Sequence, residues 1–182
     1  LETPMIRPPS LPGLLRPLLL VSLFSLSAAA EKTSDLGLHY QLNGSAIEAR
    51  GLGEGTLRGF PQAPFTAGKV GPKALACSAG QYVALPSFYR GNQFSKLGVS
   101  VWINTAQGAD QVLLSYDRQE YWELGINGDF AGEGQVSFGI NTNDGVKNLA
   151  SATRVDDGLW HNVVATFNGS TGSLQLYLDG VL

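Results

Sequence analysis

The sequence is poor in cysteine, histidine and charge. Its 182 residues include one cysteine and two histidines, and charged side chains make up 15% of the chain, against roughly 25% in an average soluble domain. A single cysteine excludes a disulfide within the chain, and the absence of CxxC and HExxH patterns argues against a zinc site. The basic residues are scattered and the net charge is −3. Nucleic acid is therefore not expected as a partner, because it requires a clustered basic face.

Common catalytic motifs are also missing from the sequence. There is no GxSxG elbow, phosphate-binding loop or dinucleotide fingerprint, so neither a serine hydrolase nor a nucleotide-dependent enzyme is indicated. A retaining glycosidase needs two carboxyl groups about 5–5.5 Å apart. Glu120 and Glu123 are three residues apart and would face opposite ways on a strand. We expect both to be solvated surface carboxylates, and we expect the chain not to be an enzyme.

What the chain has in abundance is glycine and alternating apolar residues. Glycine occupies 23 positions and apolar residues make up 43% of the chain, a composition that predicts many tight turns around one core. Apolar residues recur with a period of two and are separated by Asn-Gly and Asp-Gly turn signals, which predicts an all-β sandwich or barrel. The stretch 51–72 is expected to be a long surface connection. Strands are expected at about 36–43, 96–104, 111–116, 122–126, 136–140, 161–167 and 173–178.

The N-terminal segment has the three parts of a secretory signal peptide. Met5 is the expected start, and Arg7 and Arg16 precede an apolar run at 18–26 that is followed by Ala28 to Ala30. The run is shorter than the roughly 20 apolar residues that cross a bilayer, and no later segment is long enough. The sequence thus predicts a signal peptide at 1–30, cleavage after Ala30, and a secreted domain at 31–182 without a membrane span.

Two sequons agree with secretion, at Asn43-Gly44-Ser45 and Asn168-Gly169-Ser170. Asn-Gly is also a turn device in its own right, so turn formation without a glycan is the alternative at both sites. Cys77 has two interpretations in an oxidising compartment: it is buried as a small apolar side chain, or it pairs with a cysteine outside this chain.

The C-terminal half carries a recognisable succession of motifs. An acidic-Gly turn precedes a Trp-His strand start and a later Asp-Gly turn, and an alternating strand lies upstream at 99–103. In this order the motifs resemble the laminin G-like family, jelly-roll sandwiches related to concanavalin A-type lectins and pentraxins. The resemblance covers about 36–182 and implies an antiparallel sandwich of two sheets. Its motif residues are interpreted as structural: Asp157, Gly158, Trp160, His161, Asp179 and Gly180.

The resemblance also implies a place for calcium, at loops on the rim of the sandwich. The acidic and amide residues in such loops are Asp110, Asp117, Asp129, Glu133, Asn143 and Asp144, with Asp110, Asp117, Asn143 and Asp144 as the calcium candidates. Six to eight oxygen ligands from several loops suit this cation. Acidic turns that bind no metal are the alternative.

By the same resemblance, the expected function is a non-catalytic extracellular recognition or adhesion module that contacts glycans or protein surfaces. The alternatives are a carbohydrate-active enzyme on the same fold, either a glycosidase or a lyase, and a structural domain of a larger secreted protein. Family members continue from the Asp179-Gly180 turn into a further strand beside the first one. The segment 36–43 is therefore expected to form an open edge, with a chain truncated at both ends and with any cysteine partner of Cys77 beyond Leu182.

Overall fold

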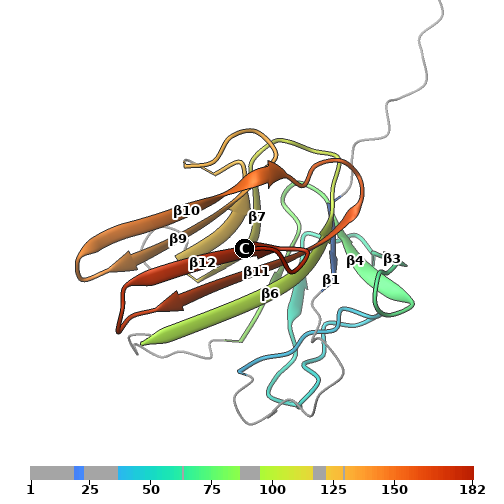
Figure 1. Cartoon of the computed structure of the whole chain (residues 1–182). Coiled ribbons are helices and arrows are strands. Elements are labelled where there is room, and N and C mark those ends of the chain that lie inside the picture. Colours follow the sequence, from blue (N-terminus) through green and yellow to red (C-terminus); the bar gives the residue numbers. More distant parts are fainter. Residues whose placement is uncertain (1–18, 23–36, 63, 87–94, 117–121, 129) are drawn as a thin grey trace, which may run out of the picture.

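Most strands of the described residues form two antiparallel sheets stacked face to face, as a computed structural model of the chain shows (Figure 1). The structure describes residues 19–22, 37–62, 64–86, 95–116, 122–128 and 130–182. These residues contain no helix, and therefore no helix that is long and apolar enough to cross a membrane. The expected antiparallel sandwich of the jelly-roll class is confirmed.

The larger sheet has six strands, and its long strands supply the clearest alternation. Neighbours along this sheet are β12 (Ser173–Leu178), β11 (Trp160–Asn168), β6 (Lys96–Asn104), β1 (Leu19–Ser22), β4 (Lys73–Cys77) and β3 (Phe65–Ala67). In the β6–β11 register, Val101 is opposite Val163 and Trp102 is opposite Asn162. Successive side chains point to opposite faces, so Val101 and Val163 share the inner face and Trp102 lies on the outer one, as the alternation predicts.

The second sheet has four strands in the order β10 (Gly145–Arg154), β9 (Gln135–Thr142), β8 (Trp122–Ile126) and β7 (Gln111–Tyr116). A separate ribbon pairs β2 (Thr56–Arg58) with β5 (Tyr82–Ala84). The sequence does not predict β10, and it treats β2 and β3 as part of a surface connection. The expectation of an unbroken connection at 51–72 is therefore wrong, because β2 and β3 each pair with a strand that lies after it in the chain.

The core lies between the two sheets. Val101, Ile103 and Val163 from the six-stranded sheet are fully buried, as are Leu124 and Phe138 from the four-stranded sheet. Burial of side chains of this size contributes about 1.5–3 kcal/mol each to stability. The alternating residues therefore fix which face of each strand points inward, since a slip of one residue would expose all of them.

The described residues 37–43 do not form the edge strand that the sequence predicts at 36–43. Leu42 has φ of +50° and turns the chain, and the segment makes two isolated bridges, Tyr40 with Glu48 and Ile47 with Glu54. Tyr40 and Leu42 are 2% and 3% exposed, which contradicts the expectation that this apolar face loses its cover. The turn at Leu42 is the physical reason: it directs the segment over the core and away from the sheet edge.

The buried carboxylate of Glu48 stabilises this segment. Its Oε1 accepts a hydrogen bond from the backbone N–H of His39 at 2.8 Å, and its Oε2 accepts from those of Arg50 and Leu52 at 2.8 and 2.9 Å. Burial by itself raises the pKa of Glu48, but these donors and the nearby Arg50 charge together hold that pKa below its ordinary value. Glu48 therefore stays ionised and satisfies three backbone groups in a region without regular pairing.

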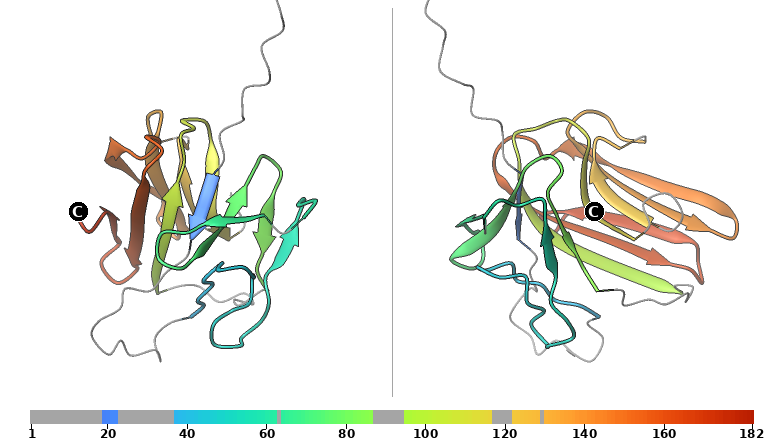
Figure 2. Two further views of the ribbon diagram at one scale, coloured as in Figure 1. Left: turned by 90° about the vertical axis from the view of Figure 1, so that its right-hand side faces the viewer. Right: turned by 180° about the vertical axis from the view of Figure 1, so that it is seen from behind.

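Strand β1 lies inside the segment that the sequence assigns to the signal peptide. It runs between β4 and β6 and pairs with both (Figure 2, blue). The sequence predicts no strand there, because the apolar run is flanked by basic residues and a small-residue end. The same run is nevertheless of strand length and apolar, which also suits a central strand. The prediction of a cleaved segment at 1–30 remains a prediction.

Candidate functional site

Three loops meet at one end of the sandwich. Asn104 at the end of β6 is opposite Trp160 at the start of β11, and Gln111 at the start of β7 is opposite Ile126 at the end of β8. The connections that leave these strands therefore emerge at the same end. We call residues 105–110, 127–134 and 155–159 the loop rim; residue 129 within it lies outside the described residues.

Backbone and amide hydrogen bonds tie these loops to one another. The N–H of Gly158 donates to the carbonyl of Thr105 at 2.8 Å, and the amide of Asn104 donates to the carbonyl of Gly158 at 2.8 Å. On the other side, the N–H of Val155 donates to the carbonyl of Gly134 at 2.9 Å. The positions of the three loops are thus fixed relative to one another before any ligand arrives.

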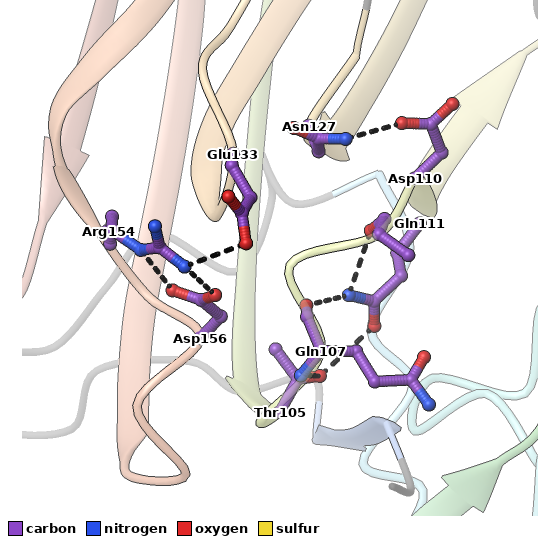
Figure 3. Close-up of polar contacts among 9 residues, drawn as sticks. Thr105, Gln107, Asp110, Gln111, Asn127, Glu133, Arg154 and Asp156 are labelled. Carbon is purple, nitrogen blue, oxygen red and sulfur yellow. Dashed lines mark hydrogen bonds and ion pairs between the residues drawn. The ribbon is translucent and has the colours of Figure 1, made fainter. Parts of the chain in front are cut away.

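Arg154 bridges two carboxylates across the rim (Figure 3). Its Nε and Nη2 donate to the two oxygens of Asp156 at 2.8 and 2.5 Å, and Nη2 lies 3.4 Å from Oε1 of Glu133. The side chain of Asp156 is 8% exposed, whereas that of Glu133 is 72% exposed. The hydrogen bond from Arg154 lowers the pKa of Asp156. Asp156 is therefore held ionised in the rim, with Glu133 on its solvent side.

Two glycines leave room for this carboxylate. Gly134 has φ of +73°, and a Cβ on it would collide with the carboxylate of Asp156. A Cβ on Gly108 would come within 2.8 Å of Oδ2 of Asp156 and 2.9 Å of Cγ of Glu133. Both glycines are required by close approach, because a side chain at either position would displace the ion pair.

A second polar set fixes the β6–β7 loop. The amide of Gln111 donates to the carbonyl of Gln107 at 2.6 Å, while its oxygen accepts from the hydroxyl of Thr105 at 3.2 Å (Figure 3). Beside it, the amide of Asn127 donates to Oδ1 of Asp110 at 2.8 Å. Asp110 is thus attached to the adjacent β8–β9 loop, and the rim presents amide and carboxylate groups in fixed positions.

Two large apolar side chains are exposed on the same rim. Phe130 on the β8–β9 loop is 60% exposed and Leu159 on the β10–β11 loop is 62% exposed. Exposed apolar residues scattered singly need no explanation. Here, however, each sits on a loop whose backbone is hydrogen-bonded to its neighbour, beside fixed polar groups. The sequence does not predict either as a site residue, because exposure in a loop leaves no periodic signal.

The motif residues cluster around His161 beside the rim. Its Nδ1 lies 2.8 Å from Oδ2 of Asp179 and its Nε2 lies 3.1 Å from Oδ1 of Asp157. Burial lowers the pKa of His161, but the hydrogen bonds and charges of the two carboxylates outweigh it and raise the pKa above its ordinary value. The backbone N–H of Leu159 donates a hydrogen bond to Oδ1 of Asp157. The hydrogen bonds that Asp157 makes with Leu159 and His161 lower the pKa of Asp157. His161 therefore connects the turn at Asp157 to the turn at Asp179 through these two hydrogen bonds.

The calcium candidates do not converge. Asp110 lies on the rim, whereas Asn143 and Asp144 lie on the β9–β10 turn, at the opposite end of the eight-residue strand β9; at 3.3 Å per residue that separation is about 26 Å. Asp117 and Asp129 lie outside the described residues. Within the described part of the chain, no group of three or more His, Cys, Asp or Glu side chains could hold a metal ion; a calcium site that also uses Asp117 stays a prediction.

The two sequons lie in different surroundings. Oδ1 of Asn43 accepts a hydrogen bond from the N–H of Lys73 at 2.9 Å, and the residue is exposed. Oδ1 of Asn168 accepts from the N–H of Ser170 at 3.1 Å, at the turn between β11 and β12. In both, the hydrogen bond uses the amide oxygen and not the nitrogen that would carry a glycan. Glycosylation at Asn43 and Asn168 remains a prediction.

Two further expectations concern single side chains. Glu123 on β8 is half-buried, and its Oε2 has almost no exposed surface, so the expectation of a fully solvated carboxylate is wrong. The reason is that β8 is a central strand, flanked by β7 and β9. Glu120 lies outside the described residues.

Cys77 packs against the core, and burial raises the pKa of its thiol to about 11, in accord with the interpretation of Cys77 as a small apolar side chain.

A family model for the concanavalin A-like lectin/glucanase superfamily, of the laminin G type, matches residues 78–182, which is more than half of the chain. The chain belongs to this superfamily. Its lectin-like domain includes β6 to β12 and the whole loop rim within the matched residues, and the resemblance to laminin G-like domains is confirmed. No curated protein and no solved structure gives a significant match to the chain. Domains of this lectin-like superfamily serve in general as carbohydrate- or protein-binding modules.

Proposed function

We propose that this chain is a non-catalytic, secreted recognition module that binds an extracellular glycan or protein surface through its loop rim. The observation that carries the proposal is the exposure of Phe130 and Leu159 on loops that are fixed to one another. A rigid backbone lowers the entropy lost on binding. An apolar ring or branched side chain beside charged and amide groups suits both the apolar face of a sugar and the anchor residues of a protein interface.

The electrostatics of the rim favour binding over glycoside hydrolysis. A glycosidase needs one carboxyl group with a raised pKa, which can donate a proton to the leaving oxygen. Asp156 has a lowered pKa and both of its oxygens contact Arg154. Arg154 also contacts the other rim carboxylate of this set, Glu133. The carboxylates of Asp156 and Glu133, both in contact with Arg154, therefore suit the positioning of a charged or polar ligand and not the transfer of a proton to it.

The experiment is a glycan array and an extracellular-protein array probed with the purified full chain, each in calcium and in chelator. Phe130→Ser and Leu159→Ser are compared with Val146→Ser, whose side chain is 59% exposed at the opposite end of β9 and β10. We expect a specific ligand whose affinity falls at least tenfold in each rim variant and is unchanged in V146S. Equal affinities in all four proteins would contradict the proposal. A loss of binding in chelator would assign calcium to the rim.

The enzymatic alternative has its own readout. The full chain is incubated with polysaccharides, and the release of reducing ends is followed by a sugar assay. Turnover that disappears in Glu120→Gln or Glu123→Gln would overturn the non-catalytic proposal. A chain that binds no array member and turns over no polysaccharide would instead support a structural role within a larger secreted protein.

A further inference from the structure

Strand β1 joins two parts of the six-stranded sheet that have no other backbone pairing among the described residues. The strands β12, β11 and β6 lie on one side of it, and β4 and β3 lie on the other (Figures 1 and 2). Val21 is opposite Ile103 of β6 and also opposite Leu75 of β4. The sheet is therefore continuous only through these few residues of the N-terminal segment.

The gap that β1 fills cannot be closed by its neighbours. Adjacent strands lie about 4.7–4.9 Å apart, so β4 and β6 are separated by two such spacings, about 9.5 Å, and cannot pair directly. The side chains that flank the gap in register with Val21 are buried: Leu75 is 1% exposed and Ile103 is 0% exposed. Backbone groups at this depth need hydrogen-bond partners, and both facing edges are antiparallel to the strand between them.

We propose that the gap between β4 and β6 is a strand-binding site, and that its occupant in the full chain is the chain's own segment Leu19–Ser22. Strand addition obtains its affinity from main-chain hydrogen bonds and excludes proline from central positions. Leu19–Ser22 contains no proline and lies just after Pro17. It is also in the middle of the apolar run that is predicted to direct export. The segment thus has two roles that exclude each other: when it is a strand of the folded sheet, it is not available to the export machinery.

One consequence concerns the domain after cleavage. Removal of residues 1–30 would take β1 away and leave β4 and β6 with facing, unpaired backbone edges. The site would then be vacant in the domain 31–182. This inference does not depend on what the loop rim binds, because the rim lies on other strands and loops.

The pairing is tested in the purified full chain with Val21→Pro, which removes one backbone donor and cannot occupy a central strand. The matched control is Phe24→Pro, in the same apolar run but outside β1. We expect V21P to lower the midpoint of thermal unfolding by roughly 6–12 °C, and F24P to leave it within about 2 °C of wild type. Equal midpoints for wild type and V21P would overturn the proposal.

Two measurements on the wild-type strand keep the proposal testable if V21P does not fold. Amide exchange followed by mass spectrometry should show protection of residues 20–22 that matches the protection of β4. Exchange of these residues at the rate of an unfolded peptide would overturn the proposal.

A protease site placed at Ala28 to Ala30 allows the folded chain to be cut after β1. We expect the N-terminal fragment to co-elute with the domain in size-exclusion chromatography. A fragment that separates and leaves the thermal midpoint unchanged would also overturn the proposal.

Discussion

Asp179 contacts His161 and the strand that carries it at the same time. Its Oδ2 lies 2.8 Å from Nδ1 of His161, and its Oδ1 accepts the N–H of Asn162 at 2.8 Å. Asp179 and Gly180 both have positive φ, and the two residues on either side bridge to each other, which is a type I′ turn. The β12 turn is therefore fastened to β11 through one carboxylate, and a protonated His161 strengthens the attachment.

We predict that the domain loses stability as the pH rises above about 6.5, the ordinary pKa of histidine, and through the raised pKa of His161. The pKa of His161 is raised in the folded state, so its contribution is fully present below its unfolded pKa of about 6.5 and is lost as the pH rises through the folded pKa. Urea unfolding at several pH values measures this change, and His161→Gln should remove most of it. The lowered pKa of Asp157 acts at acidic pH, outside this window. An identical pH profile in H161Q would show that His161 is not the group responsible.

We predict that Glu48→Gln destabilises the domain by about 2–3 kcal/mol, because hydrogen bonds to a charged group contribute about 1.5–3 kcal/mol each. The amide nitrogen of the new side chain would also face a backbone donor. Glu54→Gln is the control, since Glu54 is exposed. Denaturant unfolding at pH 7 measures both. Because the pKa of Glu48 is lowered, wild type should lose this advantage as the pH falls through that pKa; equal stability of the two variants would contradict the role of Glu48.

We predict that Gly134→Ala is more harmful than Gly145→Ala. Both glycines have positive φ, for which an L-residue costs about 1–2 kcal/mol. Nothing lies near a Cβ on Gly145, whereas a Cβ on Gly134 meets the carboxylate of Asp156. The difference between the two unfolding free energies isolates the collision from the backbone strain. If the two variants unfold at the same denaturant concentration, the rim can absorb the side chain.

We predict that Cys77 reacts slowly with thiol reagents at pH 8 in the folded chain. The thiolate is the reactive form, and burial raises the pKa of Cys77 to about 11. The rate of Ellman's reaction in buffer is compared with the rate in urea, where we expect it to be at least tenfold faster. Rapid reaction of the folded chain, or a disulfide-linked partner on a non-reducing gel, would favour the interpretation that Cys77 pairs outside the chain.

Period-two alternation in the sequence predicts β6, β8 and β12 with their observed bounds, because each of them has one face in the core, and an apolar run of strand length predicts β7. It does not predict β10, where Val146 is exposed and polar residues fill the edge of the sheet. The bend at Leu42 is also missed, since leucine has no preference for positive φ. The ion pair of Arg154 with Asp156 and Glu133 depends on where three loops meet, and no local pattern in the sequence carries that information.

Asn168 and the loop rim lie at opposite ends of the sandwich, which we call its two poles. Asn168 ends the nine-residue strand β11, whose first residue, Trp160, borders the loop rim, so the two poles are about 26 Å apart along the strand. A glycan attached at Asn168 would extend from the pole opposite the rim and would leave the approach to Phe130 and Leu159 clear. Under the proposed function, its bulk would lie away from the loops that are proposed to bind, and the rim would stay open to a partner.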